Sequence, residues 1–226
     1  DTKKSDYIIL QDPQNNNSKT IIQSSEEPSG LEFTWSFWMY IDDLDYRRGE
    51  LKNVFVKGDD LYDNISEENS NTENHIMNSP GVYLTPFDNK LLFVFNTFDT
   101  VMETFEVDNV PLNKWINVVI RCESKTIDVF VNSSFSRRYV LSSLPRQNYN
   151  NVHIGKHGGF AGFVSDLRYF NYAIGTRELN NTYRKGPNTK LLNDSSEEAT
   201  KQAAKTSKSS TVSFKPDFLS FRWMHQ

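Results

Sequence analysis

Few residues in this chain could form a catalytic site. Retaining glycosidases need two carboxyl groups about 5 to 5.5 Å apart. Glu103 and Glu106 stand three residues apart in a strand-like segment, where alternating side chains place them on opposite faces. The histidines, at positions 75, 153, 157 and 225, form no Ser-His-Asp or Cys-His pattern. We therefore predict that the protein is not an enzyme.

A weak metal candidate is the acidic run Asp42, Asp43 and Asp45. Carboxylates are ligands that Ca²⁺ accepts in flexible geometry. The regular ligand spacing of a dedicated calcium loop is missing, so a solvated turn is the preferred interpretation. We expect no cofactor, with Ca²⁺ at this run as the alternative.

The single cysteine, Cys122, excludes an internal disulfide. It stands at the end of a predicted strand without a neighbour that would activate a thiolate, which favours a buried structural thiol. The absence of disulfides favours a reducing compartment or assembly there. Five Asn-x-Ser/Thr sequons begin at Asn16, Asn64, Asn132, Asn180 and Asn193. In an Asn- and Ser-rich chain the preferred interpretation is that several arise by chance, with glycosylation as the alternative.

Composition excludes two further classes of protein. The net charge of -4 and the pI near 5.6, without a basic stripe, argue against nucleic-acid binding. No run of about 20 apolar residues occurs, so the sequence predicts no membrane span. With 226 residues, 16 of them Phe, the chain is long and aromatic enough for one large β-sandwich.

The central structural element is predicted over residues 110–133. Two β-branched runs, at 115–121 and 126–131, flank a short polar link, which is the pattern of an antiparallel hairpin. One face of these strands is apolar and needs a second layer to cover it; it comprises Ile116, Val118, Ile120, Ile127, Val129 and Val131.

A second strand, residues 31–41, alternates between apolar and polar residues. Trp38 and Tyr40 interrupt its polar face. The preferred interpretation is that they pack under a loop or a terminal segment; an aromatic platform for a sugar or a partner is the alternative.

Four segments together resemble the laminin-G-like or concanavalin-A-like jelly rolls. The first is Phe33-Thr-Trp-Ser-Phe-Trp-Met-Tyr-Ile41, and the second is the pair Gly81-Val-Tyr-Leu-Thr and Asn89-Lys-Leu-Leu-Phe-Val-Phe95. The third is Pro111-Leu-Asn-Lys-Trp115-Ile-Asn-Val-Val followed by Val129-Phe-Val-Asn132. The fourth is Val152-His-Ile-Gly155 with Gly162-Phe-Val-Ser-Asp166-Leu-Arg-Tyr-Phe-Asn171. The resemblance implies an all-β fold, a two-sheet antiparallel jelly-roll sandwich with one short C-terminal helix.

Departures from the family pattern carry expectations of their own. Ser133 stands where the family usually has Gly, and a two-residue turn with two positive φ angles prefers Asn-Gly, so we expect a longer or different loop. The family's hydrolases typically carry Glu-x-Asp-x-x-Glu on one strand, and no such string occurs. The piece from Phe95 to Asp99 resembles the metal loop of legume lectins, but the downstream Asp and His of that site are absent.

The chain divides into three parts. Residues 1–30 hold two short strand candidates, 7–10 and 19–22, that could join the sandwich. Residues 31–188 form the jelly roll, with an acidic insertion at 59–79 and a helix from about 176 to 183. Residues 189–226 are a polar linker followed by an aromatic tail.

We expect a binding or interaction module that recognises a protein or glycan partner by its surface. Candidate binding residues on the loop rim are Asn96, Asp99, Tyr149, Lys156 and His157. The aromatic tail would serve hetero- or homo-assembly through Phe214, Phe218, Phe221 and Trp223. The ending Tyr183-Arg-Lys-Gly-Pro-Asn188 and the Asn- and Lys-rich loops are similar to those of sandwich domains in large DNA viruses. This similarity implies a virion-type assembly and a virion or extracellular location. The alternative function is a polysaccharide hydrolase or lyase of the concanavalin-A-like superfamily.

Overall fold

The computed structural model of the chain describes residues 7–11, 19, 21–22, 24–27, 30–61, 77–188 and 220–223. Several predicted features lie outside these ranges. They are most of the acidic insertion, the tail residues Phe214 and Phe218, the histidines at 75 and 225, and the sequons at Asn16, Asn64 and Asn193.

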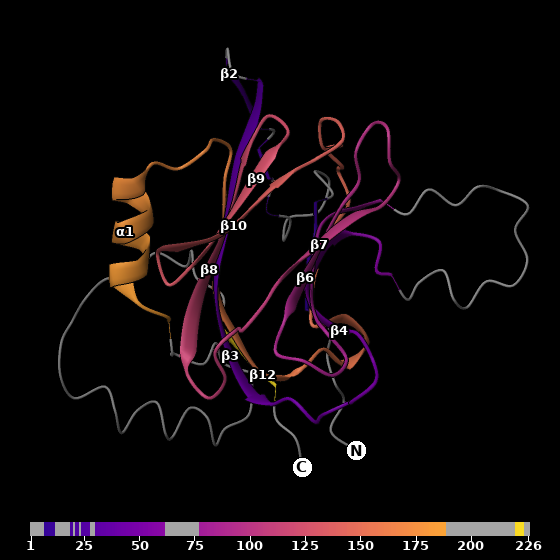
Figure 1. Cartoon of the computed structure of the whole chain (residues 1–226), viewed down its shortest axis with the longest axis vertical. Coiled ribbons are helices and arrows are strands. Elements are labelled where there is room, and N and C mark those ends of the chain that lie inside the picture. The colour runs from indigo at the N-terminus through magenta and orange to yellow at the C-terminus, as the bar shows by residue number, and fades with distance from the viewer. Residues whose placement is uncertain are drawn as a thin grey trace, which may run out of the picture.

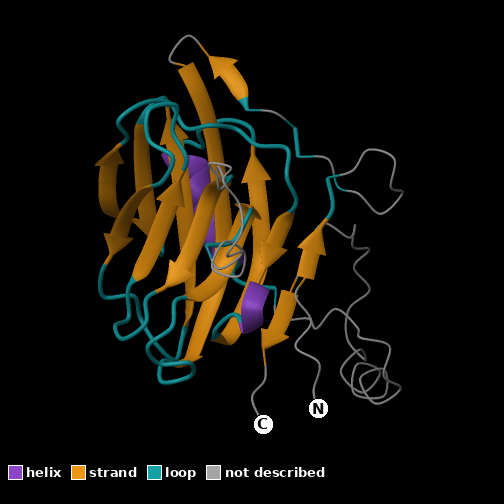
Figure 2. Ribbon diagram, turned by 90° about the vertical axis from the view of Figure 1, so that its right-hand side faces the viewer, coloured by secondary structure: helices purple, strands orange, loops and turns teal. Residues whose placement is uncertain are grey.

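Two antiparallel sheets form the molecule and face each other as two layers (Figures 1 and 2). The first contains, in spatial order, β1 (Tyr7–Ile9), β11 (Val152–Ile154), β4 (Lys52–Gly58), β5 (Asn78–Leu84), β6 (Leu91–Phe95) and β7 (Glu103–Val107). The second contains β10 (Ser134–Val140), β9 (Thr126–Val131), β8 (Trp115–Glu123), β3 (Gly30–Asp43), β12 (Ala161–Phe170) and β13 (Ser220–Trp223), and β2 (Ser25–Glu27) also pairs with β3. The predicted all-β sandwich is confirmed.

The core lies between the two layers and follows from strand alternation. The apolar face predicted for β3 is buried there: Phe33, Trp35, Phe37, Met39 and Ile41. The predicted inner face of the central hairpin joins the same core, with Val131 only partly buried. Removal of this apolar surface from water is the main favourable term for the fold.

The turn between β9 and β10 corrects one expectation. Ser134 pairs directly with Val131, so the turn contains only Asn132 and Ser133. Both residues have positive φ, 52° and 65°. Ser133 adopts the conformation that Gly would favour, and its hydroxyl contacts the side chain of Asn180 in the helix. The loop is therefore a tight two-residue turn, not a longer one.

Helix α1 (Thr176–Lys185) covers part of the outer face of the second sheet (Figure 1). Leu179 is buried against Val119 and Ile174. Tyr183 stacks on Trp38, with ring centroids 5.7 Å apart. The predicted helix is confirmed. Trp38 lies under this C-terminal helix, in line with the predicted cover by a terminal segment, whereas Tyr40 contacts Trp115 and Phe163 on neighbouring strands.

The N-terminal segment reaches the sandwich through two strands. β1 pairs with β11, which confirms the first strand candidate. The second candidate, 19–22, is wrong for its described residues, Lys19, Ile21 and Ile22, which lie outside any strand. The side chain of Gln11 explains the difference, because it accepts a hydrogen bond from the Ile21 amide (2.9 Å) and donates one to the Lys19 carbonyl (2.8 Å).

Both ends of the predicted acidic insertion belong to the sandwich. Asn78 and Ser79 begin β5. Asp60 is fully buried, and its carboxylate accepts a hydrogen bond of 2.6 Å from the Asn53 side chain.

Candidate binding site

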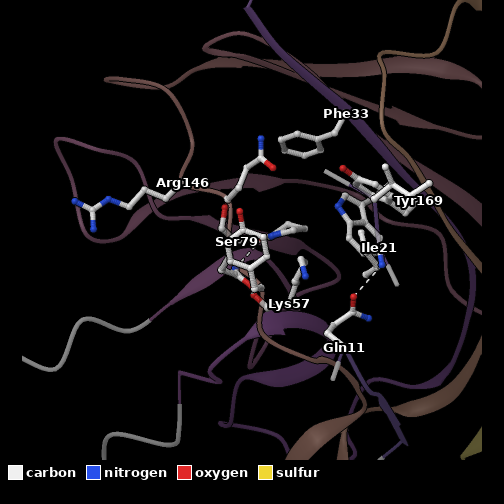
Figure 3. Close-up of a pocket in the computed structure, with 13 residues that line it drawn as sticks. Gln11, Ile21, Phe33, Lys57, Ser79, Arg146 and Tyr169 are labelled. Carbon is white, nitrogen blue, oxygen red and sulfur yellow. Dashed lines mark hydrogen bonds between the residues drawn. The ribbon is translucent and has the colours of Figure 1, made fainter. Parts of the chain in front are cut away.

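A pocket of about 120 Å³ opens at one end of the sandwich, which we call the pocket end (Figure 3). Its walls come from the N-terminal segment, from β3, β4, β5 and β12, and from the loop 142–151. The lining residues are Gln11, Ile21, Ile22, Phe33, Trp35, Lys57, Ser79, Pro80, Arg146, Gln147, Asn148, Tyr149 and Tyr169. Segments far apart in the sequence thus meet here.

The inner wall of the pocket is aromatic. Trp35 packs on Tyr169 with ring centroids 4.9 Å apart, and on Phe55 of the opposite sheet at 5.4 Å. Burial raises the pKa of Tyr169 to about 12, so its phenol is neutral at ordinary pH.

Lys57 carries the charge inside the pocket. Its residue is only 9% exposed, and its Nζ donates a hydrogen bond of 3.0 Å to the Asn150 carbonyl. Burial lowers the pKa of this amine from 10.5 to about 8, because removing a cation from water disfavours its charged form. In Figure 3 Lys57 lies between Ser79 on one side and Tyr169 and Ile21 on the other.

The loop 142–151 is held in place by hydrogen bonds to four neighbouring segments. The Asn148 side chain donates to the carbonyls of Lys57 (3.0 Å) and Ser79 (3.2 Å). The Arg146 amide donates to the Asn96 carbonyl at 2.7 Å. The Asn151 side chain accepts from the Gln11 amide at 2.9 Å, which joins the loop to the N-terminal segment. The loop that forms the mouth of the pocket is thus fixed by hydrogen bonds to backbone groups of the neighbouring segments.

Tyr149 stands at this mouth with 80% of its surface exposed. A ring in that position offers a flat apolar face and a hydroxyl to a ligand.

A second exposed aromatic, Phe98, lies beside the pocket and is 63% exposed. The Arg146 guanidinium lies 5.5 Å from the centre of its ring. The exposed apolar surface continues along the loop between β6 and β7 with Val101 and Met102, and in the loop 142–151 with Leu144. We call Phe98, Val101, Met102 and Leu144 the apolar rim.

The predicted rim residues lie at two ends of the molecule. Tyr149, Asn96 and Asp99 are at the pocket end, where the Asn96 side chain is buried and bonds the Asn78 amide and the Val101 carbonyl. Lys156 and His157 belong to the short 3₁₀ helix η1 (Lys156–Gly158) at the opposite end of β4, which we call the far end. A single site cannot contain all five residues.

At the far end, His157 is fixed by its backbone. Its carbonyl accepts a hydrogen bond from the Arg47 side chain, and the Lys156 amide donates to the Asn53 side chain at 3.2 Å. His157 has a φ of 53° and is exposed.

The acidic run near the far end is arranged as a turn. The Asp43 carboxylate accepts a hydrogen bond of 2.8 Å from the Asp45 amide, and Asp45 pairs with Arg48 at 3.2 Å. Among the described residues, no group of three or more His, Cys, Asp or Glu could hold a metal ion. Ca²⁺ at Asp42, Asp43 and Asp45 stays a prediction.

The carboxylates and the thiol considered for catalysis have structural contacts. Glu103 accepts hydrogen bonds from the Ser142 amide (3.0 Å) and hydroxyl (2.9 Å). Glu106 lies 3.6 Å from the Lys90 ammonium. Cys122 is buried, as predicted, and burial raises its pKa further from the range of a nucleophile.

Lys57 was missed in the sequence, although a signal for it exists. It follows Phe55 by two residues in β4, and side chains two residues apart in a strand share a face, which here is the inner one. A lysine on the inner face of a sandwich strand must find a solvated opening or a partner. Trp35 and Tyr169 could not be recognised, because nothing in their own strands distinguishes a pocket wall from the core.

Comparison with known proteins identifies the fold. A sequence profile described as the Concanavalin A-like lectin/glucanases superfamily matches residues 4–180. No curated protein matches the chain. Among the described residues, no helix is long and apolar enough to cross a membrane.

The similar solved structures are binding domains of botulinum neurotoxins. The receptor binding domain of botulinum neurotoxin D shares 13% identity over 74% of this chain and 39% of its own, with a TM-score of 0.51. The serotype G binding domain of botulinum neurotoxin shares 11% identity over 73% of this chain and 39% of its own, also with a TM-score of 0.51. The serotype D ligand binding domain in complex with N-acetylneuraminic acid shares 12% over 69% and 36%, at 0.50. The chain spans less than two fifths of each, and such low identity supports the shared fold alone.

Proposed function

This chain belongs to the Concanavalin A-like lectin/glucanases superfamily, and from that premise we propose that it is a non-catalytic module that binds a saccharide at the pocket end. One observation carries the proposal: Tyr149, 80% exposed, stands at the mouth of a pocket with an aromatic wall and polar groups. Saccharides present flat C–H faces and hydroxyls, and an aromatic ring beside amide groups complements both.

The polar groups of the pocket suit the recognition of hydroxyls. Gln147 and Gln11 contribute amides, Ser79 a hydroxyl and Lys57 an ammonium. Amides and hydroxyls both donate and accept hydrogen bonds, as sugar hydroxyls do. Similarity to binding domains of neurotoxins agrees with a binding role but does not identify the ligand.

Catalysis finds no support at this pocket. Glycoside hydrolysis needs a pair of carboxyl groups, and no Asp or Glu occurs among the described residues that line the pocket. A hydrolase or lyase therefore remains the less supported function.

A protein partner is the second candidate, and the apolar rim favours it. Phe98, Val101, Met102 and Leu144 are exposed beside the pocket. Exposed apolar surface of this kind is common where proteins associate. A glycoprotein could use both surfaces, with its saccharide in the pocket and its backbone on the rim.

The C-terminal tail supports a further proposal, assembly with other chains. Residues 220–223 form β13 and pair with β12, Phe221 opposite Val164 and Trp223 opposite Gly162. A strand at the end of a linker can pair with its own sheet or with that of a second copy. Light scattering on the full chain and on a chain ending at Asn188 tests this. We expect the full chain alone to associate, and two monomers would refute it.

A glycan array tests the saccharide proposal. The full chain is screened beside Tyr149→Ala, with Phe87→Ala as the matched control, since Phe87 is an exposed aromatic in the loop after β5 at the far end. We expect defined glycans to be bound by the full chain and the control, and lost in Tyr149→Ala. Equal binding by both variants would contradict a site at the pocket.

A further inference from the structure

The charge inside the pocket has one sign. Two charged residues line it, Lys57 and Arg146, and both are cations. No Asp or Glu occurs among the described lining residues. Burial alone lowers the pKa of Lys57, to about 8, and no charged neighbour contributes to this change.

Arg146 does not compete with Lys57 for the interior of the pocket. Figure 3 shows its side chain extending away from the pocket, and its guanidinium lies over Phe98. The Lys57 ammonium is therefore the one cation that reaches the interior from the described walls.

The hydrogen bonding of Lys57 leaves capacity for a ligand. An ammonium has three donors, and among the described residues its Nζ donates to one acceptor, the Asn150 carbonyl. A buried cation without an anionic partner is unfavourable. An anion that enters the pocket would meet both the charge and the remaining donors.

The size of the pocket limits what can enter. An engineered cavity of about 150 Å³ holds a benzene molecule, so a pocket of about 120 Å³ accommodates a carboxylate and not a whole sugar ring. Tyr149 lines the pocket and is largely exposed to solvent, so its ring can contact a sugar ring that remains at the mouth.

We propose that the pocket recognises an acidic saccharide: Lys57 binds the carboxylate of a uronic acid residue, and Tyr149 packs on the sugar ring. This rests on the proposed function and adds the class of saccharide. An ammonium–carboxylate pair inside a pocket is stronger than a neutral hydrogen bond, because both partners are charged and water is largely excluded.

Binding then depends on pH in a defined direction. The groups that face the ligand and could titrate are Lys57, Tyr149 and Tyr169, while Arg146 stays charged. Tyr169 is neutral below about 12. The cation of Lys57 is present below pH 8 and is lost as the pH rises through its pKa of about 8. Affinity for a carboxylate should therefore fall about tenfold between pH 7 and pH 9, whereas an ordinary lysine would change it very little.

The experiment compares matched sugars on the full chain. D-galacturonate and D-galactose, and D-glucuronate and D-glucose, differ only at C6, where a carboxylate replaces the hydroxymethyl group. Saturation-transfer NMR and titration calorimetry measure the dissociation constant of each sugar, into the millimolar range. The variants are Lys57→Gln, Lys57→Arg and Tyr149→Ala, with Lys114→Gln as the control because Lys114 is exposed and distant from the pocket lining. Circular dichroism confirms that each variant is folded.

We expect at least one uronate to bind more tightly than its neutral partner, and its affinity to fall about tenfold or more in Lys57→Gln. Lys114→Gln should bind as the full chain does. If Lys57→Arg binds, its affinity should not change between pH 7 and pH 9.

Three results would overturn the inference. Equal affinity for a uronate and its neutral partner, both lost in Tyr149→Ala, would refute the acidic class and keep the saccharide site. Preference for the uronate that survives in Lys57→Gln would remove Lys57 from the site. Failure of all four sugars to bind would count against both the inference and the proposed function, and glycan-array binding that depends on Tyr149 would then separate the two.

Discussion

Two lysines on one strand show how the ends of this sandwich differ. Lys52 is the first residue of β4 and Lys57 is the last but one, and both are buried. Lys52 at the far end donates to the carbonyls of Leu44 (3.0 Å) and Pro86 (3.4 Å). Lys57 at the pocket end donates to the Asn150 carbonyl and lines an open pocket.

The charges around the two lysines differ as well. Burial lowers the pKa of Lys52, Arg47 lowers it further, and the carboxylates of Asp43, Asp45 and Glu50 oppose this. Burial alone lowers the pKa of Lys57. The far-end cation is thus part of a folded loop with nearby acids, whereas the pocket-end cation faces a space that a ligand can fill. The same residue type thus holds a loop at one end and lines an open pocket at the other, where we propose that it binds a ligand.

The largest expected effect is at the far end. Lys52→Met removes the donor to two loop carbonyls, and buried acceptors without partners are unfavourable, so the free energy of unfolding should fall by about 2 kcal/mol. Urea unfolding at pH 7 measures the change, with Lys114→Met as an exposed control. An unchanged midpoint would remove the structural role of Lys52 and with it the comparison.

A smaller effect of opposite sign is expected at the pocket end. Lys57→Met removes a cation that burial disfavours and loses one hydrogen bond, so the free energy of unfolding at pH 7 should rise by about 1 kcal/mol. The same urea titration applies. Loss of stability in both methionine variants would mean that the two lysines play the same role.

The pH dependence sharpens this result. The pKa of Lys57 is about 8 in the folded chain and 10.5 when unperturbed, so the unfolded state binds the extra proton between these values. Stability contributed by this group therefore rises with pH across that window. The free energy of unfolding of the full chain should therefore approach that of Lys57→Met as the pH rises from 8 to 10.5. A difference between the two that stays constant over this range would disprove the lowered pKa of Lys57.

The smallest effect concerns the exposed rings. Tyr149→Ala and Phe87→Ala should each change the free energy of unfolding by less than about 0.5 kcal/mol, since exposed side chains contribute little. Thermal unfolding followed by circular dichroism measures both. A large loss in Tyr149→Ala alone would assign that ring to the fold, and its effect on binding would then be indirect.

Local pattern, together with the resemblance to concanavalin-A-like jelly rolls, was sufficient to predict the architecture. The alternation of residues 31–41 placed Phe33, Trp35 and Phe37 in the core, and the helix predicted from about 176 to 183 is α1. Alternation works because a strand has only two faces and one of them must be buried. The prediction of a longer or different loop at Ser133 was wrong, because this non-glycine residue adopts a positive φ in a tight two-residue turn.

The candidate site was accessible to sequence reasoning only in part. Tyr149 could be singled out as an aromatic in a polar loop, and it lies at the pocket mouth. Asn96 looked equally suitable as a rim residue, yet its side chain is buried in hydrogen bonds to backbone. Composition of a loop does not reveal which of its polar groups the fold itself uses.

By itself, the sequence determined the long strands such as 31–41, their apolar faces and the sandwich class, because these depend on neighbours a few residues apart; it was wrong for the short segment 19–22. The tertiary structure alone decided that Gln11, Lys57, Tyr149 and Tyr169 share one pocket, and that Lys156 and His157 lie at the other end. These placements depend on pairings between distant segments, such as β1 with β11 and β11 with β4. Such long-range pairing sets which side chains meet and hence where a buried lysine can remain open to a ligand.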